Sequence, residues 1–174
     1  RKSSPLRRWI WDGGDETQYS CRQFAPAFNL MHEAGLACTV HAGEVAGPES
    51  VIQALDELPV SRIGHGVRST DDPALIERLV ANGIVLEVCP GSNLALGLYD
   101  SPQDHPLNEL RQAGVTVTLG SDDPPFFGTT IGAEYERAQR DFGLSTDELL
   151  DITAMAIYAA FVDDGSKRLL RARL

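Results

Sequence analysis

Residues 72–90 read DPALIERLVANGIVLEVCP, a stretch that predicts an α-helix followed at once by a buried β-strand. Asp72 is a helix-capping residue, and Pro73 suits the first turn of a helix. Gly83 is typical of the residue that ends a helix, and residues 84–88 form the clearest strand of the chain. The helix carries an apolar stripe with helical spacing, made of Leu75, Ile76, Leu79 and Val80.

The same order of helix, turn and short apolar strand occurs three more times. The predicted strands span residues 37–40, 61–64 and 115–119, and they lead to His41, to His65 and to the pair Asp122-Asp123. The fourth strand follows a longer connection than the others, and we expect the extra residues to form a loop from Gly91 to Asp104. Helices and strands that alternate at this spacing predict parallel βαβ units and an α/β fold.

Two α/β architectures fit this pattern: a doubly wound open sheet and a (β/α)8 barrel. In both, ligands bind at the carboxyl ends of the parallel strands, where the polar residues fall in this sequence. No glycine-rich dinucleotide fingerprint follows any predicted strand, which disfavours the nucleotide-binding form of the doubly wound sheet.

The number of units predicts only part of a barrel. Four units, with residues 8–11 as the remnant of a fifth strand, make about half of a fold that takes ~250 residues. We therefore expect residues 1–174 to be the C-terminal half of a single (β/α)8 barrel domain, with 1–11 as a poorly matching N-terminal segment. Additional C-terminal helices are predicted by a capping box at Ser145 and Glu148 and by residues 164–173. Such a half-barrel leaves open sheet edges, which the missing N-terminal half or another chain would cover.

Charge and composition exclude several classes of function. The net charge is −10, which argues against nucleic acid or an anionic membrane as a partner and favours a small polar ligand. No apolar run reaches the ~18 residues of a membrane helix. The cysteines are few and widely spaced, so neither a disulfide framework nor a structural zinc cluster is expected, and a cytoplasmic location fits best. They are Cys21, Cys38 and Cys89.

The polar residues at the strand ends predict a metal site. His41 can present a ring nitrogen to a metal, and small residues at 42 and 43 let the chain bring Glu44 back toward it. A single histidine at a strand end is usually structural, but His65 ends the next strand, and neighbouring strands lie ~4.8 Å apart. With the adjacent carboxylates of Asp122 and Asp123, the set indicates zinc chemistry with an open coordination position.

Other reactive side chains are weaker candidates. Cys89 precedes a proline and has no obvious activating partner, and Ser92 lacks the turn that exposes a serine nucleophile. His32 lies within a predicted helix and His105 at the entrance of another, and we interpret both as structural residues.

Five segments in order resemble the adenosine deaminase family of metal-dependent hydrolases. They are Asp15-Glu16 after Gly14, His41-Ala42-Gly43-Glu44, Arg62-Ile63-Gly64-His65-Gly66, Cys89-Pro90-Gly91-Ser92-Asn93 and Ser121-Asp122-Asp123-Pro124. The resemblance covers the chain from about residue 12 to its end. It implies a (β/α)8 barrel with one Zn²⁺ at its mouth and the hydrolytic deamination of adenosine to inosine and ammonia.

The resemblance also implies a role for each matching residue. His41 and Asp122 would bind zinc, and Glu44 would protonate the purine ring nitrogen beside the reacting carbon. His65 would orient the attacking water and help to deprotonate it. For the purine nucleoside, Asp123 would hold another ring nitrogen and the backbone of Gly14 would contact the ring from below.

Two departures from the family pattern bear on this expectation. The family has a His-x-His pair on its first strand that completes the zinc ligands, and the chain has no such pair. With two protein ligands, we expect this chain alone to bind zinc weakly and to turn over little substrate. In addition, residues 8–13 do not resemble the hydrophobic strand expected before Gly14.

One residue bears on the substrate. Relatives that deaminate free adenine usually carry aspartate before the histidine of the third segment. This chain has Gly64 there, which leaves room beside His65 and favours adenosine. Three alternatives remain at this stage: an adenine deaminase, a non-catalytic partial barrel that binds a purine or a partner chain, and another zinc or iron amidohydrolase that acts on a ring amide.

Overall fold

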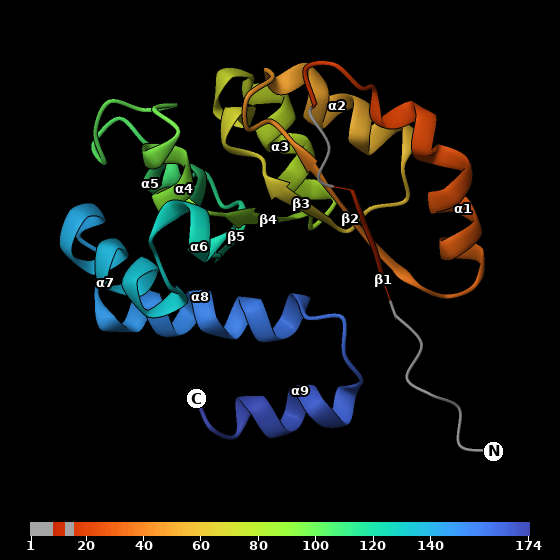
Figure 1. The fold of residues 1–174 in the computed structure, drawn as a ribbon. Coiled ribbons are helices and arrows are strands. Elements are labelled where there is room, and N and C mark those ends of the chain that lie inside the picture. Colours follow the sequence, from red (N-terminus) through yellow and green to blue (C-terminus); the bar gives the residue numbers. More distant parts are fainter. Residues whose placement is uncertain (1–8, 13–15) are drawn as a thin grey trace.

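The computed structural model describes the backbone of residues 9–12 and the whole of residues 16–174 (Figure 1). Its strands form one parallel sheet in the order β1-β2-β3-β4-β5. The strands are β1 (Trp9–Asp12), β2 (Ala37–Ala42), β3 (Arg62–His65), β4 (Val85–Val88) and β5 (Thr116–Leu119). The predicted remnant of a strand near the N-terminus is therefore confirmed, because β1 pairs with β2 along its length.

Helices connect the strands and follow the last of them. They are η1 (Cys21–Phe24), α1 (Ala25–Glu33), α2 (Pro48–Glu57), η2 (Val67–Asp71), α3 (Pro73–Ala81), α4 (Pro90–Ala95), α5 (Leu107–Gln112), α6 (Pro124–Phe127), α7 (Ile131–Phe142), α8 (Thr146–Ala159) and α9 (Asp164–Arg171), of which η1 and η2 are 3₁₀ helices. Two predicted caps are present: the Asp72 side chain accepts the N–H of Ala74 at the start of α3, and Ser145 and Glu148 form the capping box of α8.

The strand order distinguishes the two predicted architectures. In a doubly wound sheet the spatial order of the strands reverses at a switch point, whereas in a barrel each new strand is added beside the previous one. The five strands follow one another in sequence order, which is the arrangement of half a (β/α)8 barrel. Within the described residues, β1 and β5 each pair with one neighbour and form the two sheet edges.

Two helical layers enclose the core of the described residues. In Figure 1, α1, α2 and α3 lie on one side of the sheet, and α8 and α9 lie on the other, where α8 packs against β5. The buried core includes Phe28, Ile63, Leu79, Leu86 and Leu107. None of the helices in residues 16–174 is long and apolar enough to cross a bilayer.

The segment that we expected to be a loop from Gly91 to Asp104 begins differently, because it enters helix α4 at once. The first turn of α4 is held by a residue far along the chain, because the N–H of Gly91 donates to the Glu134 carboxylate of α7 at 2.8 Å. Glu134 has no exposed surface, and it also accepts the hydroxyl of Thr129. This buried carboxylate fixes the position of α4 and of the residues on it.

Candidate active site

The predicted site residues lie where the chain leaves the carboxyl ends of neighbouring strands. His41 is the penultimate residue of β2, His65 is the last residue of β3, and Asp122 follows β5. His41 stands opposite Gly64 in the ladder between β2 and β3, and Ala42 stands opposite His65. The register therefore brings the two imidazoles to adjacent strand ends.

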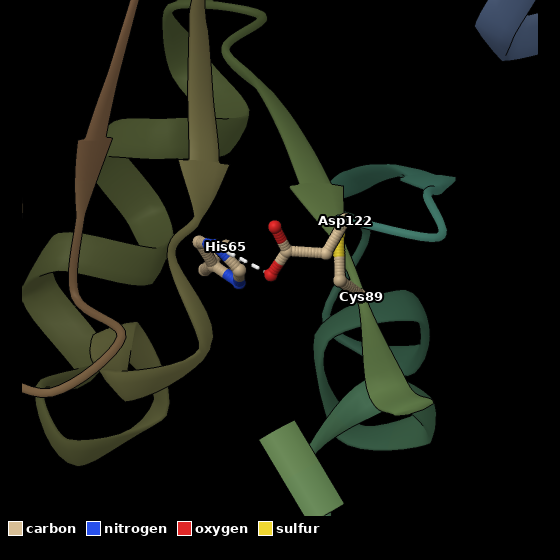
Figure 2. Close-up of side chains that lie close together, drawn as sticks. All are labelled: His65, Cys89 and Asp122. Carbon is tan, nitrogen blue, oxygen red and sulfur yellow. Dashed lines mark ion pairs between the residues drawn. The ribbon is translucent and has the colours of Figure 1, made fainter. Parts of the chain in front are cut away.

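His65 is the centre of the cluster. Its Nδ1 lies 3.3 Å from Oε1 of Glu44. Its Nε2 lies 3.8 Å from Oδ2 of Asp122, the ion pair drawn as a dashed line in Figure 2. The centroid of its ring is 4.8 Å from that of His41. His65 is only 2% exposed, and three of the other five predicted site residues lie around its buried imidazole.

Two of these residues have strained backbones. His65 has a φ of 62° and Asp122 a φ of 54°, and both values lie in the left-handed region that L-amino acids rarely adopt. Such a conformation costs on the order of 1–3 kcal/mol, and it is concentrated at functional sites. The strain falls on the two strand ends that carry the cluster.

Gly64 makes room for His41. Paired residues of neighbouring strands project to the same face of a sheet, so the His41 ring lies over Gly64. A Cβ at position 64 would lie 2.3 Å from Cδ2 of His41. The free space that the sequence assigned to substrate beside His65 is thus occupied by the imidazole of His41.

The turn that carries Glu44 is held by a residue to which the sequence assigned no role. Oε1 of Glu16 accepts the backbone N–H groups of Glu44, Val45 and Ala46, and Oε2 accepts those of Gly43 and the Ser50 hydroxyl. One carboxylate therefore organises the whole turn after β2. Glu16 stands in the first segment of the family resemblance, and this was its only signal in the sequence.

Burial shifts the pKa values of Glu44 and His65 in opposite directions. Burial, together with the charges of Asp122 and Glu16, raises the pKa of Glu44 to about 7, against an opposing effect of the hydrogen bond from Asn93. Burial, together with His41, lowers the pKa of His65 to about 4, against opposing effects of the charges of Asp122 and Glu16. At neutral pH the imidazole of His65 is therefore uncharged, and Glu44 can both give and take a proton.

Of two more buried side chains near the cluster, Asn93 contacts both Glu44 and His65, and His105 contacts Asn93. Nδ2 of Asn93 donates to Oε1 of Glu44 at 3.0 Å and lies 3.4 Å from Nδ1 of His65. Nε2 of His105 lies 3.1 Å from Oδ1 of Asn93. Sequence reasoning gave Asn93 no role and interpreted His105 as structural, because their connection to Glu44 depends on the tertiary fold.

Cys89 lies against the cluster without being activated. Its sulfur, a ring nitrogen of His65 and a carboxylate oxygen of Asp122 all lie within 4.8 Å of one another (Figure 2). Burial, together with the charge of Asp122, raises the pKa of the thiol well above its ordinary range. The thiol is therefore protonated at neutral pH, which disfavours Cys89 as a nucleophile.

The remaining predicted residues lie away from the cluster or outside the description. Asp123 is exposed and precedes the short helix α6, so its contact with a purine stays a prediction. Gly14 lies outside the described residues. His32 is exposed on α1, in keeping with its interpretation as a structural residue.

The donor atoms present suit a zinc ion. Imidazole nitrogens and a carboxylate oxygen are ordinary zinc ligands, and His41 and Asp122 each lie beside the buried ring of His65. The four histidines of the chain, at positions 32, 41, 65 and 105, include no His-x-His pair, so further ligands would have to come from elsewhere.

A parallel half-barrel with imidazole and carboxylate groups at its carboxyl end is the arrangement of the barrel amidohydrolase class. A family model described as adenosine deaminase matches residues 12–174. The chain belongs to the adenosine deaminase family.

Several curated relatives of this chain are named adenine deaminase. An adenine deaminase from Rhizobium leguminosarum bv. trifolii is 51% identical over 174 residues, which are 100% of this chain and 54% of that protein. An adenine deaminase from Agrobacterium fabrum is 51% identical over 161 residues, covering 92% of this chain and 50% of that protein. The chain thus spans about half the length of the curated relatives it matches.

Solved structures agree with this assignment. The crystal structure of an adenine deaminase from Arthrobacter aurescens has a TM-score of 0.89 and 34% identity, over 94% of this chain and 50% of that one. An amidohydrolase from Burkholderia ambifaria with bound Zn has a TM-score of 0.86 and 29% identity, over 94% of this chain and 46% of that one.

Proposed function

We propose that this chain is half of a hydrolytic purine deaminase and that the full-length protein converts adenine and water into hypoxanthine and ammonia. The observation that carries the proposal is the convergence on buried His65 of two carboxylates, Glu44 at 3.3 Å and Asp122 at 3.8 Å. Similarity over the whole chain to proteins named adenine deaminase supports the reaction class.

Adenine is better supported than adenosine, which the sequence favoured. The argument for adenosine depended on free space over Gly64, and the His41 ring takes that space. The relatives that are 51% identical are named adenine deaminase, as is the solved structure that is 34% identical. We therefore propose the free base as substrate.

We also propose Zn²⁺ as the metal, with His41 and Asp122 among its ligands. A bound zinc ion lowers the pKa of a water molecule from 15.7 toward ~7 and so supplies a nucleophile at neutral pH. The two residues are too few for a complete site, so the remaining ligands would come from the other half of the barrel. The bound Zn in the structure from Burkholderia ambifaria supports this choice.

The chain's own residues supply the proton transfers. His65, neutral at pH 7, is placed to orient water and accept its proton. Glu44, with a pKa of about 7, is placed to protonate a ring nitrogen of the purine and so to prepare the carbon for attack. Asp123 and Gly14 are the predicted contacts to the rest of the ring.

The test is an ammonia-release assay on the full-length protein with adenine and adenosine side by side. We expect the larger kcat/KM for adenine; a clear preference for adenosine would reverse the substrate assignment. If the protein turned over neither purine, the purine deaminase proposal would be contradicted. The remaining hypotheses would be a purine-binding partial barrel and another hydrolase that acts on a ring amide. Activity on hydantoins or pyrimidines would identify the latter.

Glu44→Gln tests the proton transfer. It should lower kcat by about 10²–10⁴-fold, because general acid–base catalysis contributes on that order, while zinc content stays at the wild-type level. Zinc analysis of the isolated chain is the companion measurement. Tight stoichiometric zinc in the isolated chain would show that the other half is not needed to complete the site.

A further inference from the structure

A chain of hydrogen bonds runs through the core behind Glu44. The backbone N–H of Leu107 donates to Nδ1 of His105 at 3.2 Å, and Nε2 of His105 lies 3.1 Å from Oδ1 of Asn93. The amide of Asn93 then donates from Nδ2 to Oε1 of Glu44 at 3.0 Å. Asn93 has no exposed surface and His105 is 4% exposed, so the two bonds of the His105 ring are shielded from water.

The direction of every bond in this chain is fixed by its first member. A backbone N–H can only donate, so Nδ1 of His105 must be the nitrogen without a proton. The proton of the neutral ring then resides on Nε2, which donates to Oδ1 of Asn93. This sets the orientation of the Asn93 amide, whose NH₂ group must face Glu44 and His65. Burial, with a further effect of His65, lowers the pKa of His105 to about 4, in agreement with a neutral ring.

Packing holds the ring and the amide in place. The His105 ring makes edge contacts with Tyr99 and Phe142, with centroids 4.9 Å and 5.5 Å away. Asn93 lies on α4, whose first turn is anchored through Gly91 to buried Glu134. The donor that Asn93 presents to Glu44 is therefore preorganised before any substrate binds.

We propose that His105 and Asn93 are positioning residues that orient the carboxyl group of Glu44 for proton transfer. The bond from Asn93 and the contact with His65 both fall on Oε1, which assigns Oε2 to the substrate side. The inference rests on the proposed function for its catalytic meaning, while the hydrogen-bond chain itself is a property of the described residues.

The tautomer of His105 is the first test, and it does not require activity. In the isolated chain at neutral pH, ¹⁵N–¹H NMR correlations should show His105 as the neutral ring with its proton on Nε2. A proton on Nδ1, or a charged ring, would overturn the proposed direction of the chain. The carboxyl ¹³C resonance of Glu44, assigned with Glu44→Gln, supplies a second readout.

Two substitutions at position 105 separate positioning from packing. A glutamine amide places an N–H near the position of the histidine Nε2, whereas the shorter asparagine reaches only as far as Nδ1. His105→Asn should shift the Glu44 ¹³C resonance and lower kcat of the full-length protein by roughly 10- to 100-fold, because misplacing a catalytic group by ~1 Å costs about 10²-fold. KM should change less than threefold, and His105→Gln should restore most of both signals.

Asn108→Ala is the control for loss of a partly buried hydrogen bond nearby. Asn108 donates to the carbonyl of Phe142, which also contacts His105, but it has no part in the chain to Glu44. We expect it to lower stability without a change in kcat. An equal loss of kcat in Asn108→Ala, or no recovery in His105→Gln, would overturn the proposal. If the wild-type protein deaminates no purine, the proposed function fails, and the tautomer and the ¹³C shift still decide for or against the positioning chain.

Discussion

The Glu16 carboxylate accepts the backbone N–H of Glu44 at 2.8 Å, and the side chains of the two residues also influence each other through their charge. Glu16 thus has two effects on Glu44. It fixes the turn on which Glu44 lies, and its negative charge raises the pKa of the Glu44 carboxyl. A proton donor near neutral pH requires both a fixed position and a raised pKa.

Glu16→Ala should destabilise the chain and impair catalysis together. The substitution leaves the N–H groups of residues 43–46 without their charged acceptor, and hydrogen bonds to charged groups contribute about 1.5–3 kcal/mol. We expect a loss of about 2–3 kcal/mol in urea unfolding. Glu57→Ala, which removes an exposed ion pair with Arg22, is the control and should cost less than about 1 kcal/mol. Equal losses in the two variants would contradict the role of Glu16.

Gly64→Ala should displace His41. The new Cβ would overlap the His41 ring, so zinc affinity of the full-length protein should fall by roughly 10- to 100-fold, as for other changes that disturb ligand orientation. Metal analysis after dialysis against a graded chelator measures this. Gly132→Ala, where the nearest atom is 3.8 Å from the added Cβ, is the control and should bind zinc normally. Unchanged zinc affinity in Gly64→Ala would remove His41 from the proposed ligand set.

Glu134→Ala tests the anchor of α4. Removal of this buried carboxylate leaves the N–H of Gly91 and the hydroxyl of Thr129 without their acceptor, while the partly exposed Arg137 keeps its ion pair with Asp141. A buried polar group left without its partner costs about 1–3 kcal/mol, so urea unfolding followed by circular dichroism should show a loss of about 2–4 kcal/mol. On the same helix, exposed Glu136→Ala should stay within about 0.5 kcal/mol of the wild type. A comparable small effect at position 134 would show that α4 is held by other contacts.

Glu148 should contribute to stability in acid. Hydrogen bonds from the backbone and side chain of Ser145, and then from Arg111, lower its pKa to about 2. Because the folded-state pKa is depressed, the contribution is complete above the unfolded value of 4.5 and is lost as the pH falls from there toward 2. The drop in urea midpoint between about pH 6 and about pH 3 should be smaller in Glu148→Gln than in the wild type. A drop of the same size in both would show that other groups determine the acid response.

The strands and the half-barrel were predictable because their signals are local. The apolar run at residues 84–88 predicts a strand by itself. The helix before it is predicted by the cap at Asp72 and the stop at Gly83, all within one short stretch of sequence. Helix α4 was missed for the opposite reason. Its anchor is Glu134, far along the chain and on another helix, and no short window of sequence contains both partners.

The same difference divides the site. The proximity of His41, His65 and Asp122 was predictable because the carboxyl ends of parallel strands lie along the same edge of a sheet. The support given by Glu16 and His105 was not predictable, since it depends on hydrogen bonds across loops and packed helices. Gly64 was misinterpreted for a related reason: from the sequence its missing side chain favoured a larger substrate, and in the fold it accommodates the ring of His41.

The positive φ angles of His65 and Asp122 have a consequence for the evolution of this sequence. Glycine adopts such angles without strain, so selection for folding alone would favour glycine at both positions. Histidine and aspartate persist there only while their chemistry is under selection. A lineage that lost the need for the reaction should therefore lose these two side chains early and become more stable as it did so.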